Sequence, residues 1–317
     1  VGSEMCVRDS FNSYIGKAIT NACDGIFKTN IEDGQNDQST QNNQVDTMLA
    51  KGASAVAVSV CDVTAAPTLI QKCKDAGNVP IIFFNKEITD YDVINSYENA
   101  YQVTSTGGDY GASIQAQMVI DYWKEHPEMD KNGDGKLQLV YLMGDPGHTA
   151  SQPRCDYLKS TIEDAGIEID LLAEDTGMWV TATAKEKMDA WVSKYGDEIE
   201  CCVAGNDAMA LGALSAVEAA GFNTDGEESS KYIPIYGIDA LPEILSKIES
   251  GEITGSVLQD AKTQGQTIVK MAENLTSGKD AVDGIEGVEV EEEAKAVRVP
   301  YQAITKDNLD LAKSTYE

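Results

Sequence analysis

The feature that most constrains the fold is a regular alternation of short apolar, β-branched runs with longer segments of helical periodicity. A strand buried on both faces is a continuous apolar run, whereas a covering helix repeats apolar residues every three or four positions. The runs predict strands at 53–60, 80–84, 137–143, 199–204, 233–238 and 254–258. Helices are predicted at 42–51, 64–76, 111–123, 154–165, 183–194, 207–220, 242–250 and 264–277. This repetition favours an α/β fold of parallel sheets with helices on both faces.

Length and charge narrow the possibilities. At 317 residues the chain is long enough for two domains, so we expect two doubly wound parallel-sheet lobes. The net charge of −29 would repel phosphate backbones and anionic lipid, so we expect no nucleic acid and no membrane surface as partner. The chain opens on Val1-Gly2-Ser3 without the pattern of a leader, so we expect any targeting segment to lie outside this sequence.

Two further features have simple structural interpretations. The seven cysteines are odd in number and lie mostly in apolar runs, which predicts buried, reduced thiols and no disulfide framework. The acidic run at 286–293 predicts a solvated strand edge or loop, because blocks of like charge are usually exposed.

One loop has the spacing of a calcium site. Oxygen donors fall at positions 1, 3, 5 and 9, position 7 offers its carbonyl, and Gly135 at position 6 permits the sharp turn. The ligands would be Asp130, Asn132, Asp134, the carbonyl of Lys136, and Gln138. Position 12, where a bidentate glutamate is expected, is Tyr141, so a further donor must come from elsewhere. An ordinary turn rich in Asp and Asn is the alternative.

Polar side chains also follow four of the predicted strands. Asn85, His148, Asn206 and Asp239 each come shortly after an apolar run, at the edge where doubly wound sheets bind ligands. Each alone could be a helix cap, and the repetition is what favours binding. The aromatic residues Phe11 and Trp179 could be ligand platforms or core.

Planar hydrogen-bonding groups combined with flat aromatic rings suit a pyranose. A pyranose ring has an apolar C–H face and an edge of hydroxyls, and each hydroxyl donates once and accepts twice. Amide, carboxylate and guanidinium groups match such an edge in fixed geometry. The sequence therefore indicates a sugar as the ligand.

Several blocks of the chain resemble the bacterial D-galactose/D-glucose-binding proteins, a branch of the type I periplasmic binding proteins. The shared blocks are 35–39 (QNDQS), 80–87 (PIIFFNKE), 146–148 (PGH), 187–191 (KMDAW), 206–210 (NDAMA), 239–243 (DALPE) and 297–301 (VRVPY). They keep their order over about residues 6 to 308.

The resemblance implies an architecture and a role. It implies two lobes joined by three hinge crossovers, with residues 1–111 and 262–297 forming the N-terminal lobe and 112–261 and 298–317 the C-terminal lobe. A hexose would bind in the cleft between them, close the hinge and be delivered to the membrane permease of an ABC transporter. A chemoreceptor is a second possible partner. We expect a monomer outside the cytoplasm, periplasmic or lipid-anchored on the outer face of the cell membrane.

The resemblance also assigns site residues. The hydrogen-bonding residues would be Asp9, Asn85, His148, Arg154, Asn206, Asp239 and Gln259, and the aromatic platforms would be Phe11 and Trp179. Glu200 matches the remote glutamate that completes the family's calcium site. Three positions depart from the family: Ala150 replaces the aspartate that holds the anomeric hydroxyl, Gln259 replaces an asparagine, and Asp145 replaces a glutamate. These changes bear on which hexose or C1-substituted glycoside binds.

Two other classes of function compete with a transport protein. A glycoside-acting enzyme would use paired carboxylates, for which Asp9 and Asp239 are candidates. A sugar-sensing regulator core would need a helix-turn-helix and a basic face, and the sequence has neither. Because nucleotide-binding loops and nucleophile elbows are also absent, we expect no catalytic residues and no enzymatic activity.

Overall fold

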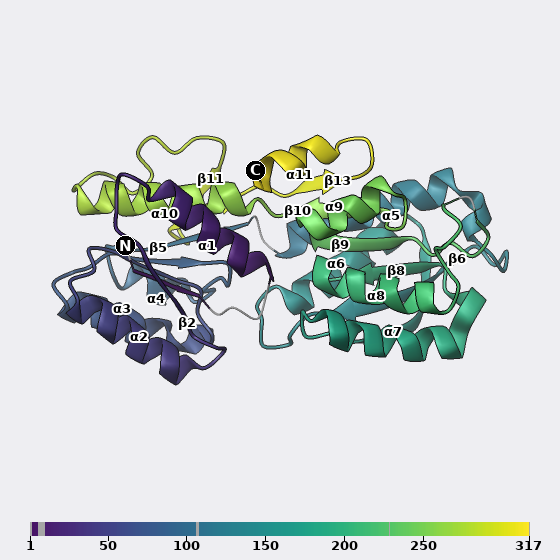
Figure 1. The fold of residues 1–317 in the computed structure, drawn as a ribbon, viewed down its shortest axis with the longest axis horizontal. Coiled ribbons are helices and arrows are strands. Elements are labelled where there is room, and N and C mark those ends of the chain that lie inside the picture. The colour runs from purple at the N-terminus through teal and green to yellow at the C-terminus, as the bar shows by residue number, and fades with distance from the viewer. Residues whose placement is uncertain (1, 6–9, 106–107, 228, 317) are drawn as a thin grey trace. The chain divides into compact units, whose positions relative to one another are not determined.

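The computed structural model describes residues 2–5, 10–105, 108–227 and 229–316. The chain forms two compact α/β units (Figure 1). Unit 1 comprises Val1–Thr106 and Asp260–Pro300, and unit 2 comprises Gly107–Gln259 and Tyr301–Glu317. The chain therefore passes from one unit to the other three times.

Unit 1 contains a seven-stranded sheet in the order β11-β12-β5-β4-β3-β1-β2, parallel except at the β11–β12 edge. Its strands are β1 (Gly2–Met5), β2 (Asn30–Asp33), β3 (Val56–Val58), β4 (Ile81–Phe84), β5 (Ala100–Ser105), β11 (Glu289–Glu291) and β12 (Ala296–Val299). Its helices are α1 (Ser10–Ala22), α2 (Gln38–Ala50), η1 (Val63–Ala65), α3 (Ala66–Asp75), α4 (Tyr91–Asn95) and α10 (Ala261–Thr276). Helices α1 and α10 pack side by side (Figure 1), so closely that a Cβ atom on Gly265 would lie 2.5 Å from that of Ala18.

Unit 2 contains a six-stranded sheet in the order β13-β10-β9-β8-β6-β7, in which only β13 is antiparallel to its neighbour. Its strands are β6 (Lys136–Met143), β7 (Glu168–Thr176), β8 (Cys201–Ala204), β9 (Ile235–Asp239), β10 (Gly255–Leu258) and β13 (Gln302–Ile304). Its helices are α5 (Gly108–Glu125), η2 (Pro127–Met129), α6 (Ser151–Asp164), α7 (Thr181–Tyr195), η3 (Gly196–Glu198), α8 (Asp207–Ala219), α9 (Pro242–Glu249) and α11 (Leu309–Tyr316).

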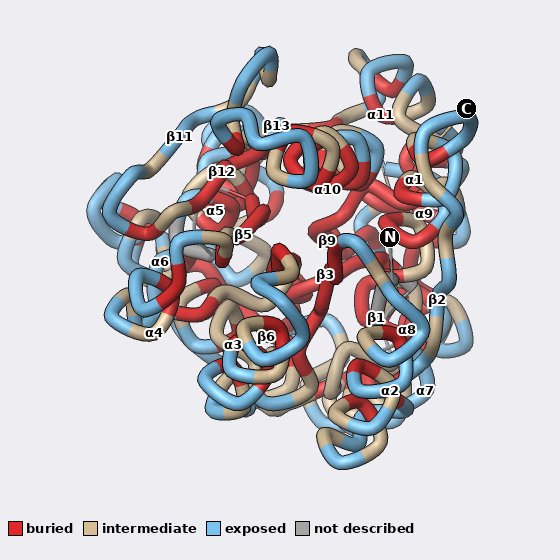
Figure 2. The backbone as a smooth tube through the Cα atoms, turned by 90° about the vertical axis from the view of Figure 1, so that its left-hand side faces the viewer, coloured by how far each residue is buried: buried red, intermediate tan, exposed pale blue. Residues whose placement is uncertain are grey.

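The predicted doubly wound fold is confirmed, and the burial pattern of unit 2 shows why it forms. Along β6, Leu139 and Tyr141 pack into the core shared with α5 and α6, whereas Val140 and Leu142 pack into the core shared with α7 and α8. Successive strand residues point to opposite faces, so a strand covered on both sides must be apolar throughout. In Figure 2 the tube is accordingly red, the colour of buried residues, along β3 and β9.

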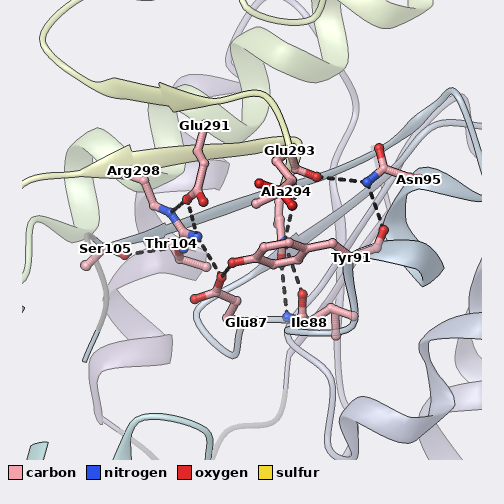
Figure 3. Close-up of polar contacts among 11 residues, drawn as sticks. Glu87, Ile88, Tyr91, Asn95, Thr104, Ser105, Glu291, Glu293, Ala294 and Arg298 are labelled. Carbon is pink, nitrogen blue, oxygen red and sulfur yellow. Dashed lines mark hydrogen bonds and ion pairs between the residues drawn. The ribbon is translucent and has the colours of Figure 1, made fainter. Parts of the chain in front are cut away.

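The acidic run at 286–293 contains the edge strand β11 and loop residues on both sides of it, as predicted, and a buried arginine contacts the strand (Figure 3). The guanidinium of Arg298 donates to Glu291 of β11 at 2.7 Å, to Glu87 at 2.6 Å and to the hydroxyl of Thr104 at 2.7 Å. Tyr91 donates to the same Glu87 carboxylate at 3.1 Å. Glu87, the last residue of the shared block at 80–87, therefore has structural partners in unit 1.

The cysteines also follow the prediction within the described residues. Five of them are buried, free thiols: Cys23, Cys73, Cys155, Cys201 and Cys202. Burial raises the pKa of Cys73 to about 12, so this thiol stays protonated and unreactive near neutral pH. Across the ranges given above, no helix has both the length and the apolar character needed to cross a membrane.

Candidate functional site

The predicted polar residues of unit 2 gather at one edge of its sheet. Strands β10, β9, β8 and β6 are parallel neighbours, so their carboxyl ends meet at the same edge. Gln259, Asp239, Gly205 and Gly144 are the residues that end or follow these strands. The structure thus brings together groups that lie more than 100 positions apart in the sequence.

Arg154 is the centre of this group. Its side chain is 6% exposed, and its Nη1 donates to the carbonyl of Gly205 at 2.6 Å. Its Nη2 lies 3.2 Å from both Gln259 Oε1 and the hydroxyl of Tyr301. The Nε atom is buried and has no hydrogen-bond partner among the described residues. The guanidinium is thus fixed on one side and has a donor to spare.

Trp179 lies against the same strand ends. The Arg154 Cζ atom is 5.5 Å from the centre of its indole, a distance compatible with cation–π attraction. The His148 ring meets the indole edge-on at 5.4 Å between centroids. Because the backbone N–H of Ala150 donates to His148 Nδ1, the neutral imidazole carries its proton on Nε2. The indole Nε1 is buried, without a partner in the described part of the chain.

Asn206 has two roles. Its Oδ1 accepts from the N–H of Met209 at 3.0 Å, so it caps helix α8, as one interpretation of the sequence proposed. Its Nδ2 is buried and finds no acceptor among the described residues. Since a buried polar group without a partner costs about 1–3 kcal/mol, such a group indicates a role beyond the cap.

Three of the predicted sugar residues have a left-handed backbone. The φ angles are 61° for Asn85, 61° for Trp179 and 127° for Asp239. Each such residue costs about 1–3 kcal/mol, and strain of this kind concentrates at ligand sites. The strained positions all follow or end a parallel strand, where doubly wound folds place their ligands.

In unit 1 the structure describes two of the three predicted residues. The side chain of Asn85 donates to Asn12 Oδ1 at 3.0 Å, while the neighbouring Lys86 donates to the carbonyl of Cys61. Phe11 is only 1% exposed. Asp9 lies outside the described residues. Of the two described residues, Asn85 therefore pairs with another amide, and Phe11 is buried.

Asp207 is a buried carboxyl next to the predicted site. It is 0% exposed, and it accepts from the hydroxyl of Ser256 at 2.6 Å and the N–H of Leu241 at 2.8 Å. Burial raises the pKa of Asp207 to about 7, and these hydrogen bonds oppose the rise only in part. The folded protein therefore holds a proton that the unfolded chain releases near pH 4.

Asp207→Asn is expected to change the pH dependence of stability. Between pH 4.5 and 8 the free energy of unfolding of the wild-type protein should fall as the pH rises, because Asp207 keeps its proton in the folded state and loses it in the unfolded state. The neutral amide can donate to Ser256 and accept from Leu241, so the variant should gain on the order of 2–3 kcal/mol relative to wild type across that range. Urea unfolding at both pH values measures the difference; parallel profiles would contradict this assignment.

The predicted calcium loop forms a tight turn between η2 and β6. Asp130 accepts the N–H groups of Asp134 and Gly135 at 3.1 and 3.0 Å, and Asn132 also accepts from Asp134. The two oxygens of Glu200 accept from Lys131 and Gln138 at 2.7 and 3.0 Å. The remote glutamate therefore reaches the loop, although 62 positions separate it from Gln138.

The donor chemistry of this loop fits a hard cation. Glu200 is 1% exposed, and burial raises its pKa, with the nearby Asp130 carboxylate adding to the rise. Gln138 Oε1 is buried without a partner among the described residues, beside a cavity of about 940 Å³ that Asn132 and Glu200 also line. In the described ranges, however, no three His, Cys, Asp or Glu side chains are grouped to hold a metal. The carboxylates instead bind the loop's own N–H groups.

Sequence reasoning missed several residues of the site. Tyr301 and Asn12 contact Arg154 and Asn85, yet they lie in segments with no strand-end signal. Gly144 and Gly205 matter because they have no side chain, and Thr176 holds the backbone of Gly144. Only the shared block at 297–301 gave a hint of Tyr301.

Comparison with known proteins places this geometry in a family. Residues 7–280 match the family model described as "Periplasmic binding protein domain". The D-galactose/methyl-galactoside binding periplasmic protein of Haemophilus influenzae is 42% identical over 95% of this chain and 87% of its own length. A putative rhizopine-binding protein of Rhizobium meliloti is 29% identical over 98% of this chain and 91% of its own.

A solved structure has the same fold. An ABC transporter solute-binding protein from Bacillus halodurans, solved with bound myo-inositol, is 27% identical, with a TM-score of 0.78 over 99% of this chain and 97% of that one. The family match spans most of the chain, and the fold is the same as that of the solved structure. This chain belongs to the periplasmic binding protein family.

Proposed function

We propose that this protein is a hexose-binding protein that delivers its sugar to an ABC transporter. The observation that carries the proposal is the set of spare donors around the indole of unit 2. Arg154 Nε, Asn206 Nδ2 and Trp179 Nε1 are buried donors without partners among the described residues. Sugar hydroxyls can accept from such groups, and the indole provides a face for the apolar side of the ring.

The relatives support a hexose in particular. The Haemophilus influenzae protein, the more similar of the two relatives named above, is described as binding D-galactose and methyl-galactoside. D-galactose and D-glucose, with their C1-linked glycosides, are accordingly the ligands proposed for this chain. A glycoside-acting enzyme is the alternative, because a binding carboxylate such as Asp239 has the same chemistry as a catalytic one.

Isothermal titration with D-galactose, D-glucose, myo-inositol and D-ribose tests the proposal. We expect saturable one-to-one binding of at least one of the two hexoses and weaker binding of the other two compounds. Incubation with a chromogenic galactoside and glucoside separates a binder from an enzyme, since a binder leaves both intact. A folded protein that binds neither hexose would contradict the proposal.

Further elements of the proposal concern location and partners. The family is extracytoplasmic, and we propose a periplasmic protein or one anchored by lipid on the outer face of the cell membrane. The membrane permease of the transporter would be its main partner, a chemoreceptor a second, and the protein itself a monomer. Coexpression with a candidate permease and measurement of sugar-stimulated ATP hydrolysis test the first of these.

Sugar binding is expected to close the hinge, as the resemblance to the galactose-binding branch predicts. A ligand that binds one arrangement of the two units better than another shifts the population toward it. Small-angle scattering should show a smaller radius of gyration when saturating hexose is added. A radius that does not change, with binding confirmed by titration, would contradict hinge closure.

Ala150 is expected to leave room at the anomeric carbon. It is the N-cap residue of α6, where its methyl group makes no hydrogen bond, and the nearby His148 contacts Trp179. Ala150→Asp should strengthen binding of the free hexose at least about tenfold, because a charge-assisted hydrogen bond contributes about 1.5–3 kcal/mol. It should weaken binding of the methyl glycoside, which the new side chain would exclude.

Titration of galactose, glucose and their methyl glycosides against both proteins tests this expectation. Ala150→Asn is the matched control, since it has nearly the same size and no charge. If wild type rejected every glycoside and Ala150→Asp changed nothing, the idea of an open anomeric end would be wrong.

We also propose one structural calcium ion in unit 2. Asp130, Asn132, Asp134, the carbonyl of Lys136, Gln138 and Glu200 would hold it. What supports this proposal is the spacing of the loop, the contact of Glu200 with the loop, and the spare oxygen of Gln138. The ion would balance the closely placed carboxylates of Asp130 and Glu200.

A further inference from the structure

The indole of Trp179 rests on a strand end where only glycine leaves room. A Cβ atom on Gly144 would lie 2.0, 2.1 and 2.3 Å from the indole atoms Cζ2, Cη2 and Cε2. These atoms belong to a rigid fused ring, so no flexible end can move aside. Gly144 is not among the glycines with positive φ, and its backbone would accept alanine. Glycine is therefore needed at position 144 to leave space for the indole, and not to allow a turn.

The loop that carries the indole is held from the other side. The hydroxyl of Thr176 donates to the carbonyl of Gly144 at 2.6 Å and accepts from the N–H of Met178 at 3.1 Å. Gly177 donates to the carbonyl of Met143 at 2.7 Å. Met178 and Trp179 have backbone φ angles of 55° and 61°, in a left-handed region that few non-glycine residues adopt. The loop thus cannot retreat from the strand end to make space for a larger residue at position 144.

The indole is also placed relative to the donors of the site. The Arg154 guanidinium lies 5.5 Å from its centre and donates to the carbonyl of Gly205, whose own Cβ atom would meet indole Cζ3 at 3.2 Å. Arg154 and Trp179 are therefore both positioned on the end of β8. A sugar ring stacked on the indole can reach the donors Arg154 Nε and Asn206 Nδ2 only if the indole lies at the right distance from the strand end.

We propose that Gly144 is a positioning residue that sets the depth of Trp179 and thereby the fit of a polyhydroxylated saturated ring. The inference rests on the proposed function of hexose binding. A methyl group at position 144 would force the indole outward by about 1.5 Å, from 2.0 Å to an ordinary carbon–carbon contact distance of about 3.5 Å. A sugar ring stacked on the displaced indole would then no longer hold its hydroxyls within hydrogen-bond distance of Arg154 Nε and Asn206 Nδ2.

Titration of hexose against four variants tests the proposal. Gly144→Ala should weaken binding at least tenfold, and Gly205→Ala should weaken it clearly less, because its contact of 3.2 Å needs only a small adjustment. In a Trp179→Phe background, adding Gly144→Ala should change affinity less than threefold, since phenylalanine lacks the clashing part of the indole. Equal losses for the two glycines, or a tenfold loss from Gly144→Ala in both backgrounds, would overturn the proposal.

A second measurement does not depend on the ligand. The chain has three tryptophans, so Trp123→Phe combined with Trp191→Phe leaves Trp179 as the only one. In that protein, Gly144→Ala should raise the acrylamide quenching constant at least 1.5-fold, because the indole moves outward. Unchanged quenching would overturn the proposal even if hexose binds.

The titration and the quenching measurement distinguish a failure of the proposed function from a failure of the role proposed for Gly144. If wild type bound no hexose, the proposed function would fail, and quenching would still decide where Gly144 places the indole. If Gly144→Ala alone did not fold, the proposal requires that Gly144→Ala with Trp179→Phe does fold. Failure of both to fold would overturn it, because the steric conflict with the indole would not be the cause.

Discussion

Replacing Arg154 by methionine is expected to weaken hexose binding at least 100-fold, a loss of about 2.7 kcal/mol. Methionine keeps much of the side-chain volume but removes every donor, including the spare Nε. It also leaves the carbonyl of Gly205 and the oxygen of Gln259 without the donor that holds them. Stability should therefore fall as well, by about 1–3 kcal/mol. Titration on the folded variant measures the first effect and urea unfolding the second.

Gln115→Met is the matched control for this substitution. Gln115 is fully buried in unit 2, and its amide donates to the carbonyls of Ala204 and Gly237, near the ends of the same strands. The control should lose similar stability and keep its hexose affinity within threefold. Similar losses of affinity in both variants would mean that Arg154 acts through general packing rather than through contact with the sugar.

Removing the proposed calcium ion is expected to lower the melting temperature by roughly 5–10 °C. An ion present at 100 times its dissociation constant stabilises the folded state by about 2.7 kcal/mol. In a domain of this size, each kcal/mol changes the melting temperature by about 2–4 °C. Thermal unfolding with and without a chelator, together with elemental analysis of the purified protein, measures the effect.

Two carboxylate variants locate the ion. Glu200→Gln should melt at a lower temperature than wild type and respond little to the chelator. Asp170→Asn changes an exposed carboxylate on the wall of the same cavity that is not among the proposed ligands, and it should respond as wild type does. A wild-type protein that contains no metal and melts identically with the chelator would show that the loop is an ordinary turn.

Most of the interior strands of both sheets could be predicted from the sequence. β3, β4, β8, β9 and β10 are buried at every residue, so the sequence in and around each is mainly apolar. Strand β7 was missed because it is an edge strand with no fully buried residue, and acids interrupt its apolar residues. Helix α1 was missed because asparagine, serine and threonine interrupt its apolar spacing.

The site was predictable only in part. Side chains that follow strands, such as Asn206 and Asp239, can be found because the fold fixes where they gather. The hydrogen bonds of Arg154 to Gln259 and Tyr301 join positions 105 and 147 apart, which no local pattern reveals. The role of Gly144 is equally hidden, since a glycine after a strand most often marks a turn. Its meaning depends on the distance to an indole 35 positions away.

A crystal structure determined with the tightest-binding hexose of the titration panel tests the central claim most directly. The account predicts a pyranose whose hydroxyls accept hydrogen bonds from Arg154 Nε and Asn206 Nδ2 and whose apolar face lies on Trp179. A sugar bound away from these three residues, with their donors satisfied by protein atoms, would contradict it.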